Sequence, residues 1–578
     1  MYLNNKKIVT IEKIFMNGFI YTMDNKNNIY ESMGISQGKI VFLGNNNEAM
    51  KLINENTEII DLRYKTIIPG VIDTYIKIPE KVIMKKDDLN LFECTSSNEY
   101  LKVIKDYMDT HIDKEVIYGW GWDFNKFIKD NDSYSYKGPH KSLLNTISVE
   151  KAIILMDLTG HMLWMNDKAF EYYGIIKESS SPIGGKIEHD EQGELWGTLK
   201  DNAVKLIDIS KVKEYSNKDY LHGFIKFQER LHSYGITSVG MIENHSYNIP
   251  LDVYRLLEIK DNLKLRINYA IDILPYEIQH RTIYEQIREL KRLKIIYKSR
   301  YFDITRACFQ GDGLIEMNSA FLFKPYRNSE NCGNDYLGRF KWDVLEFKEA
   351  IKMANRLDFD VAIECRGDNA CKVAIDGIEY SQKNNNYNTC RNSMVHLDLI
   401  TKYYIRRMKL LGISAIIHPF WYYENDNSVK IEYKSIGEDR IQRLYPYKTL
   451  VKNNIITAAA SEYYIEDVPN PLKGIWCAVT RNLYDFKNPL YNENNIMKNP
   501  KYRLNPNERV SIQEAVRSFT IDAAYVLGKE KEVGSIEYGK NADFIVLDKN
   551  IFEIASEEIA NTSVCATYFD GRLVYTSE

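Results

Sequence analysis

The feature that most constrains the fold is an alternation of short apolar segments with amphipathic segments through the middle of the chain. Amphipathic segments such as 344–358 and 399–412 have apolar residues spaced three and four apart, the period of a helix with one buried face. Eight apolar segments alternate with them: 66–73, 235–243, 266–273, 302–310, 360–364, 393–398, 413–419 and 455–462. Eight strand–helix units predict an α/β fold built on a distorted (β/α)8 TIM-like barrel over residues 67–534.

The regions outside this alternation predict two additions to the barrel. The stretch between the first two apolar segments is far too long for one crossover, which predicts an inserted subdomain at about 85–205. Both ends of the chain contain short runs rich in β-branched and aromatic residues, with turn dipeptides such as Asp570-Gly571. Residues 1–66 and 535–578 are therefore predicted to form a small composite β-sandwich from both termini.

Composition excludes several classes of function. The formal net charge is −4 and no basic stripe is present, so nucleic acid is not an expected partner. No stretch approaches 18 apolar residues, so no membrane partner is expected. The eight cysteines are scattered without a CxxC pair and the start has no leader segment. These features predict reduced thiols and a cytoplasmic location.

A series of short motifs follows in a fixed order along most of the chain. They are Ile68-Pro69-Gly70-Val71-Ile72-Asp73, Gly119-Trp120-Gly121-Trp122-Asp123, Gly160-His161 with Trp164 and Asn166, Gly184-Gly185 with Gly193-Glu194 and Gly197, Asp312-Gly313 with Ser319-Ala320 and Pro325-Tyr326, Gly367-Asp368 with Ala370, and Gly534-Ser535-Ile536 with Gly539 and Asp543. Each motif alone is a weak signal. In this order they resemble the amidohydrolase superfamily, specifically amidohydrolase family 3.

The resemblance implies a hydrolase that acts on non-peptide C–N bonds of a small molecule, often as a homodimer. Members of the family hold metal at the carboxyl-terminal ends of the barrel strands. The ligands are a His-x-His pair after strand 1, a carboxylated Lys or Glu on strand 4, His on strands 5 and 6, and Asp on strand 8. Such ligands hold a divalent ion that activates water at neutral pH.

This chain has other residue types at most of those positions. In chain order the six positions are occupied by Tyr75, Lys77, Cys308, Glu364, His396 and Glu462. Only His396 keeps the usual type. We therefore expect a site without metal, in which Lys77 takes the place of the cation and neutralises Glu364 and Glu462, because an unpaired buried carboxylate would otherwise become protonated.

Two sets of residues could support catalysis without metal. Cys308, His396 and a glutamate would supply a nucleophile, a base and an orienting group if they converge. Tyr75 and Lys77 would instead act as an acid/base pair. A rival interpretation keeps one zinc ion, with Cys308, Glu364, His396 and Glu462 as its ligands.

Further residues are candidate contacts to the substrate, because the insertion supplies aromatic side chains and His418 ends the seventh apolar segment. They are His418, Trp120, Trp122, His161, Trp164 and Asp368. Since a fold does not fix a function, two alternatives stay open. One is acyl-transfer or lyase chemistry on the same scaffold, and the other is a pseudoenzyme that binds a small molecule or a partner protein.

Overall fold

The computed structural model describes the chain in ten stretches. They are residues 10–77, 88–127, 135–208, 215–243, 249–327, 335–385, 389–423, 433–463, 469–482 and 504–577.

The eight apolar segments of the middle region form one parallel sheet in chain order. Its strands are β8 (Val71–Ile76), β15 (Ile236–Ile242), β16 (Arg266–Asp272), β17 (Phe302–Gln310), β18 (Asp360–Cys365), β19 (Ser393–His396), β20 (Ser414–Ile417) and β21 (Thr457–Ala459). The hydroxyl of Thr74 on the first strand donates to the carbonyl of Ala459 on the last, at 2.8 Å. The sheet is thus nearly closed, and the predicted TIM-like barrel is confirmed.

The first apolar segment contains two strands. β7 (Thr66–Pro69) pairs with β22 (Phe544–Leu547) near the carboxyl terminus, whereas β8 pairs with β15 in the barrel. Gly70 lies between them, and its backbone N–H donates to the carbonyl of Asp543 at 2.9 Å. A Cβ atom at Gly70 would lie 2.3 Å from Oγ1 of Thr237, so only glycine fits where the chain passes into the barrel.

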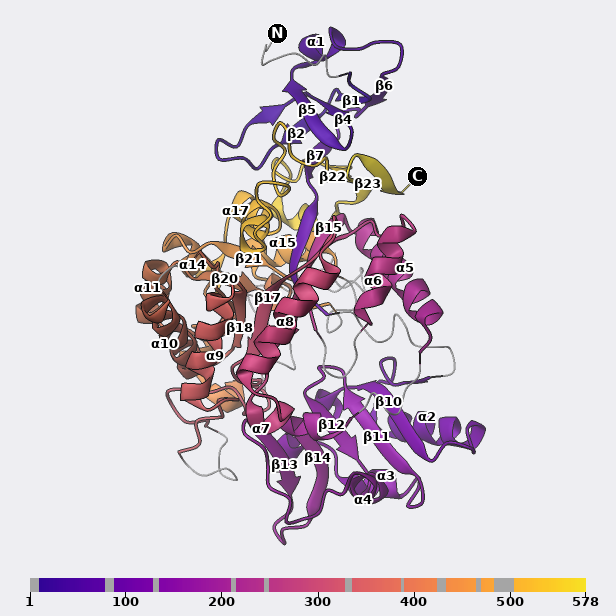
Figure 1. Cartoon of the computed structure of the whole chain (residues 1–578), viewed down its shortest axis with the longest axis vertical. Helices are drawn as coiled ribbons and strands as arrows, with labels where there is room; N and C mark the ends of the chain where they lie inside the picture. The colour runs from indigo at the N-terminus through magenta and orange to yellow at the C-terminus, as the bar shows by residue number, and fades with distance from the viewer. Residues whose placement is uncertain are drawn as a thin grey trace.

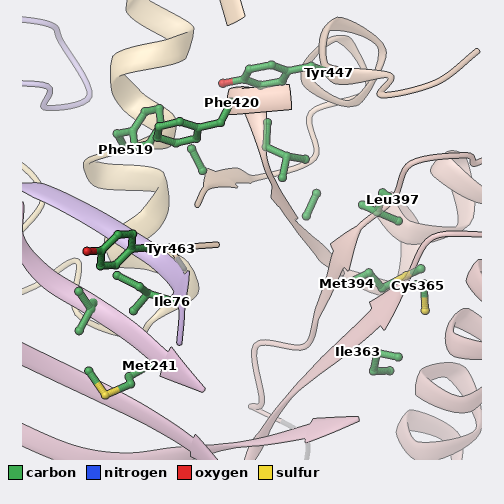
Figure 2. Close-up of a cluster of buried hydrophobic side chains, with 14 of the residues drawn as sticks. Ile76, Met241, Ile363, Cys365, Met394, Leu397, Phe420, Tyr447, Tyr463 and Phe519 are labelled. Atoms are coloured by element: carbon green, nitrogen blue, oxygen red, sulfur yellow. The ribbon is translucent and has the colours of Figure 1, made fainter. Parts of the chain in front are cut away.

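Helices cover the outside of the barrel because each has one apolar face. In α9 (Val344–Arg356), Phe347, Ala350, Ile351 and Ala354 are buried, the spacing that the sequence predicts. The other barrel helices are α5 (Asn217–Ser233), α6 (Leu251–Ile259), α8 (Ile283–Tyr297), α10 (Asp368–Asn384), α11 (Lys402–Leu411) and α15 (Pro471–Thr480). Their apolar faces and the outward side chains of the strands form one large hydrophobic cluster, part of which Figure 2 shows.

The insertion forms a separate mixed sheet below the barrel in Figure 1. Its strands, in sheet order, are β13 (Gly185–His189), β14 (Leu195–Asp201), β12 (Met162–Met165), β11 (Ala152–Asp157), β10 (Val116–Trp122) and β9 (Leu89–Asn90). Its helices are α2 (Ser97–Thr110), α3 (Lys141–Asn145) and α4 (Asp167–Tyr173).

Strands from both ends of the chain lie at the opposite end of the molecule (Figure 1). One sheet has the order β24 (Arg572–Thr576), β23 (Val564–Phe569), β22, β7, β2 (Phe19–Tyr21) and β3 (Ile29–Tyr30). The other has the order β5 (Lys39–Gly44), β4 (Ser32–Ser36), β1 (Lys13–Met16) and β6 (Glu58–Asp61). Side chains of both sheets share one hydrophobic cluster, while the sandwich geometry stays a prediction.

Short helices connect these elements. They are α1 (Asn46–Met50), α7 (Tyr276–Gln279), α13 (Glu438–Ile441), α14 (Tyr447–Lys452), α17 (Ile512–Ser518) and α18 (Ile521–Val526), with 3-10 segments at Phe124–Phe127, Ser135–Lys137, Asn202–Leu206, Pro419–Trp421, Pro506–Glu508 and Ser556–Asn561. In the part of the chain that the structure describes, none of the helices has both the length and the apolar character needed to cross a membrane.

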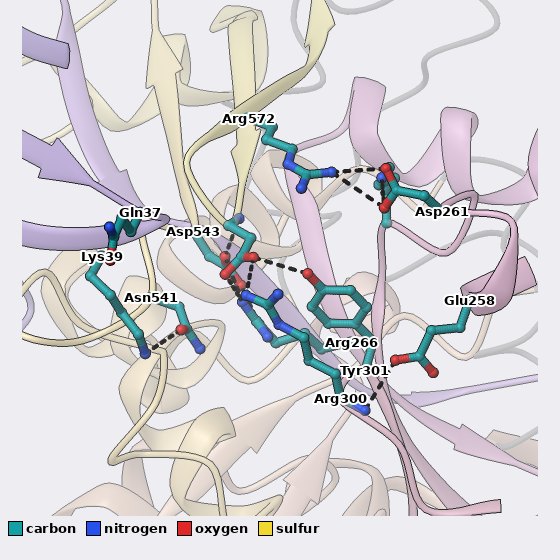
Figure 3. Close-up of polar contacts among 12 residues, drawn as sticks. Gln37, Lys39, Glu258, Asp261, Arg266, Arg300, Tyr301, Asn541, Asp543 and Arg572 are labelled. Atoms are coloured by element: carbon teal, nitrogen blue, oxygen red, sulfur yellow. Dashed lines mark hydrogen bonds and ion pairs between the residues drawn. The ribbon is translucent and has the colours of Figure 1, made fainter. Parts of the chain in front are cut away.

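A buried ionic network joins the barrel to the composite sheet (Figure 3). Nε of Arg266, at the start of β16, lies 2.6 Å from Oδ2 of Asp543, and its Nη2 lies 3.3 Å from Oδ1 of Asp570. Arg300 and Tyr301 also donate to Asp570. The charge of Arg266 is thus neutralised by residues from the far end of the sequence.

Candidate functional site

The carboxyl-terminal ends of the barrel strands bring predicted site residues to one end of the barrel, where barrel enzymes place their chemistry. We call this end the mouth. The residues at or just beyond the strand ends are Tyr75 and Lys77 of the first strand, Glu364 of the fifth, His396 of the sixth, His418 after the seventh and Glu462 after the eighth. All of them are buried.

The two residues that replace His-x-His are packed at the mouth. The phenol of Tyr75 donates a short hydrogen bond to Oε1 of Glu364. Burial and the charge of Glu364 raise the pKa of Tyr75 well above its usual value, so the phenol keeps the proton that it donates. Nζ of Lys77 lies 5.9 Å from the centre of the Tyr75 ring. Lys77 thus lies at the mouth, while its role as a substitute for the cation stays a prediction.

His396, His418 and Glu462 form the group best suited to hold a cation. One ligand atom from each lies within 4.8 Å of those of the other two. The centres of the two imidazole rings are 4.5 Å apart. Neither ring nitrogen of His396 or His418, nor Oε2 of Glu462, makes a hydrogen bond of ordinary geometry in the described part of the chain. Their contacts are long or poorly aligned: Nδ1 of His396 lies 3.8 Å from Oε2 of Glu462, and His418 interacts with the backbone of Ala460. Buried polar atoms without partners are costly, and a bound ion is one of the standard explanations for them.

The protonation states of the group suit metal binding. Burial, together with the charge of Arg366, lowers the pKa of both His396 and His418 well below the usual value. Both rings are therefore neutral near pH 7, and neutral imidazole is the form that binds metals. Burial raises the pKa of Glu462 to about 7, although Arg366 and Lys77 oppose this effect. A divalent cation would favour the ionised form of Glu462.

Two members of the group have an unusual backbone conformation. His396 has a φ of 74°, Leu397 beside it has a φ of 55°, and Glu462 has a φ of 50°. For residues other than glycine this region costs on the order of 1–3 kcal/mol each, and it persists where the surroundings impose it. Such residues cluster at functional sites, which supports a functional role for this end of strands β19 and β21.

Arg366 is a site residue that the sequence reasoning missed. Its Nη1 lies 3.0 Å from Oδ2 of Asp398, and its Nη2 lies 3.6 Å from Oε2 of Glu462. The guanidinium also lies 5.7 Å from the centre of the Trp421 ring. Arg366 lies one residue beyond the end of β18, and no local sequence pattern marks it as a partner of Asp398 and Glu462.

Cys308 lies outside the group of three potential ligands. It packs in one cluster with Tyr75 and with small and branched residues of β18 to β21, namely Ala362, Val395, Ile416 and Ala458. Burial, with the charges of Asp272 and Glu364, raises the pKa of its thiol well above the usual value. A protonated thiol is a poor nucleophile and a poor ligand. The nucleophile role stays a prediction, and these surroundings favour packing.

The insertion adds two charged side chains near the mouth, Asp201 and Lys205. Nδ1 of His161 lies 3.0 Å from Oδ1 of Asp201, and that same oxygen lies 3.1 Å from Nζ of Lys341. Nζ of Lys205 lies 3.5 Å from Oε1 of Gln310 at the end of β17. Burial lowers the pKa of Lys205 to about 8, with Asp272 opposing and Lys341 adding to the effect. No sequence pattern indicates Lys205 or Lys341 as site residues, because their neighbours are distant along the chain.

The predicted aromatic residues of the insertion lie in its own core. Trp120, Trp122 and Trp164 are at most 1% exposed and pack in hydrophobic clusters formed mainly by the insertion. Nε1 of Trp122 donates to the carbonyl of Leu155 at 2.9 Å. Oδ1 of Asp368 accepts from the N–H of Phe323 at 2.8 Å, which fixes a loop. The structure gives these four residues packing and loop contacts, and their role as substrate contacts stays a prediction.

A cavity of about 320 Å³ opens near the ends of the second and third strands, and its described lining contains none of the mouth residues named above. Glu243 and Asp272, at the ends of the second and third strands, line it together with residues of α6 and α8. Oδ2 of Asp272 accepts from the side chain of Gln310 at 3.0 Å. The volume of this cavity lies in the range of small-molecule sites, and the small-molecule partner stays a prediction.

Comparisons with known proteins agree with this architecture. The sequence model of the amidohydrolase family matches residues 58–575. The putative amidohydrolase YtcJ of Bacillus subtilis is 25% identical over 583 residues, covering 98% of this chain and 99% of that protein. The N-substituted formamide deformylase of Arthrobacter pascens is 22% identical, covering 97% of this chain and 98% of the relative.

A solved structure shares the fold along most of the chain. It is an uncharacterized metal-dependent hydrolase from Pyrococcus horikoshii, with a TM-score of 0.68 and 22% sequence identity. The match covers 94% of this chain and 99% of the other. Together with the family match, this similarity confirms the resemblance inferred from the motifs, and with it the general class of hydrolase.

Proposed function

The chain belongs to the amidohydrolase family, and from this premise we propose that it hydrolyses a non-peptide C–N bond of a small molecule bound at the barrel mouth, with one divalent cation held by His396, His418 and Glu462. The single observation that supports this site is the convergence of three buried ligand groups within 4.8 Å. Two imidazoles and one carboxylate form a ligand set common in catalytic zinc sites, which keep a fourth position open.

The residues fit one cation better than two. Tyr75 and Lys77 stand where the family has its His-x-His pair, and neither a protonated phenol nor an ammonium group binds metal. The positive charge of Lys77 instead lowers the pKa of Glu462, the effect that a second cation would have. Lys77 is thus the electrostatic substitute that the sequence suggested, beside one cation instead of in place of all metal.

Each of these side chains has a defined task in this proposal. A cation bound by the three ligands would supply Lewis-acid activation of water and of the substrate carbonyl group. Arg366 lies 3.0 Å from Asp398 and 3.6 Å from Glu462, and its charge favours the ionised forms of both carboxylates against the effect of burial. Tyr75 fixes Glu364, which is left with one oxygen that the phenol does not bind.

This ligand set differs from both predictions made from the sequence. The metal-free site stays a prediction. The loss of several usual ligands favours it, whereas the typical use of metal by family members does not. The rival zinc set included Cys308 and Glu364, which lie outside the convergent group of described residues. His418, predicted as a substrate contact, takes their place as a ligand.

Metal content and turnover test the proposal together. We expect the purified chain to bind about one equivalent of zinc, and His418→Gln to lose it, whereas His111→Gln, at the end of α2 in the insertion, should keep it. Turnover is assayed with N-benzylformamide, other amides, cyclic amides and ureas, starting from formamides because one relative is a formamide deformylase. The proposal predicts metal-dependent turnover in the parent and in His111→Gln only.

The outcomes separate the alternatives. Turnover that persists without metal and survives His418→Gln would support the metal-free site with Lys77 and Tyr75. Stoichiometric metal without any turnover would favour a binding protein on this scaffold. Release of a product other than the free acid and amine would indicate acyl-transfer or lyase chemistry.

A further inference from the structure

The loop that precedes β12 is built to hold His161 in one place. Asp157, the last residue of β11, accepts hydrogen bonds from the N–H of Met162 at 2.8 Å and from the N–H and hydroxyl of Thr159. Gly160 has a φ of 73°, which the turn requires. His161 then lies opposite Asp201, because β12 and β14 are antiparallel neighbours.

Asp201 is held at the same point from three directions. Its N–H donates to the carbonyl of His161 at 2.9 Å, and its Oδ1 lies 3.0 Å from Nδ1 of His161. Nζ of Lys341, from the barrel, lies 3.1 Å from that Oδ1. Asp201 has a φ of 50°, a strained conformation that its surroundings impose. Insertion and barrel thus meet at this trio of side chains.

The bond to Asp201 fixes the tautomer of His161. Although burial opposes it, Lys341 and the bond from His161 lower the pKa of Asp201, so this carboxylate is ionised and can only accept. Nδ1 of His161 must therefore carry the proton and donate it. In the neutral ring Nε2 then has a lone pair and can only accept.

His161 stays neutral and lies near the mouth. Burial lowers its pKa to about 4, with Asp201 opposing and Lys341 and Lys77 adding to the effect. Its side chain is 13% exposed, compared with 6% for Asp201 and 2% for Lys341, so it is the member of the trio that a ligand can reach. It also interacts electrostatically with Lys77 and His396, both residues of the mouth.

We propose that Nε2 of His161 is a fixed hydrogen-bond acceptor that selects substrates with an N–H group beside the scissile bond. This inference rests on the proposed function and names its substrate class: primary or secondary amides, formamides or ureas, but not their N,N-disubstituted analogues. A site built to accept a hydrogen bond discriminates strongly against a substrate that lacks the donor, because the buried acceptor is then left unpaired.

The test compares N-benzylformamide with N-benzyl-N-methylformamide on the zinc-loaded protein. The parent should prefer the first by about 10- to 100-fold in kcat/KM. His161→Phe should lower kcat/KM for the N–H substrate by a similar factor and remove the preference, whereas His161→Gln, whose amide oxygen can accept, should restore part of it. His111→Gln is the control and should keep the preference. Equal losses on both substrates would indicate proton transfer and overturn the inference.

A spectroscopic measurement keeps this inference separate from the proposed function. In protein labelled with ¹⁵N-histidine, His161 should be protonated at Nδ1 across neutral pH, and Asp201→Asn should abolish this preference. Saturating N-benzylformamide should shift the Nε2 resonance, and the methylated analogue should not. These shifts without turnover would overturn only the proposed hydrolysis, whereas an Nε2-protonated His161, or no selective shift, would overturn the acceptor role.

Discussion

Arg366 determines whether two buried carboxylates at the mouth can stay ionised. Asp398 and Glu462 are each about 5% exposed, and their pKa values are raised by burial to about 6 and about 7 in spite of the guanidinium. Without that cation, both groups would have to take up protons or remain as unpaired buried charges. The residue that sets the charge of the site is therefore not one of its proposed ligands.

Replacing Arg366 by methionine should destabilise the chain by about 3–5 kcal/mol, the cost of leaving buried partners of an ion pair alone. Urea denaturation at pH 7 measures this cost. The double variant Arg366→Met/Asp398→Asn should lose less stability than the sum of the two single losses, because it lacks the carboxylate of Asp398 that Arg366→Met leaves unpaired. Additive losses would show that the 3.0 Å pair contributes no coupling.

A buried histidine outside the mouth gives the fold a pH dependence. Nε2 of His232, on α5, lies 2.9 Å from the carbonyl of Lys264, and burial lowers the pKa of this ring to about 4. A base with a lowered folded pKa stabilises the fold fully above its unfolded pKa, about 6.5, and less as pH falls towards 4. The stability of the parent relative to His232→Gln should therefore fall by about 2 kcal/mol between pH 7 and pH 5. Denaturation at both values checks this, and an unchanged difference would contradict it.

At the scale of elements, the passage from β7 to β8 shows what the sequence could not predict. One apolar run, 66–73, serves two sheets, because Gly70 lets the chain pass close to Thr237 and Asp543. Periodicity within the run gives no sign of the division. The eight barrel strands were predictable, since each is a short apolar run followed by a helical pattern, and such runs have few alternatives in a large soluble fold.

The sequence predicted a site residue only where a motif or the end of an apolar segment marked its position. Lys77, Glu364, His396 and Glu462 follow directly from their strands. Arg366, Asp398, Lys205 and Lys341 take part through partners 32 to 140 residues away, as Arg366 does with Asp398 and Lys341 with Asp201. Such pairs depend on tertiary packing, which no local pattern encodes.

Gly70→Ala tests the close approach between β7 and the barrel. The added methyl group would overlap the side chain of Thr237, so we expect a loss of about 1–3 kcal/mol in stability. Thr237→Ala removes the two nearest atoms, at 2.3 and 2.9 Å. Gly70→Ala should therefore cost less stability in the Thr237→Ala background than in the parent. Thermal and urea denaturation of the four proteins gives the comparison. An equal cost of Gly70→Ala in both backgrounds would show that contact with Thr237 is not the source of the strain.

At the scale of the whole molecule, the ionic network around Arg266 ties the barrel to the carboxyl-terminal part of the composite sheet. Asp543 and Asp570 are 1% and 5% exposed at the side chain, whereas the nearby pair Arg572–Asp261 is 56% and 69% exposed (Figure 3). The two arginines therefore form a natural comparison of buried and solvated pairs in one region.

Arg266→Met should cost about 3–5 kcal/mol, because it leaves Asp543 and Asp570 with less compensating charge in a buried position. Arg572→Met, the matched control, should cost less than about 1 kcal/mol because water screens its pair. Urea denaturation of both variants supplies the numbers. Similar losses for the two would show that burial does not set the strength of this junction.

The account of the mouth depends on one divalent cation among three buried ligands. The most direct test is an anomalous difference map, recorded at the zinc edge, from crystals grown with zinc. The account predicts one peak at the mouth, in contact with His396, His418 and Glu462, with Lys77 directed towards the carboxylates. A mouth without a peak, or a peak bound by Cys308 and Glu364, would contradict it.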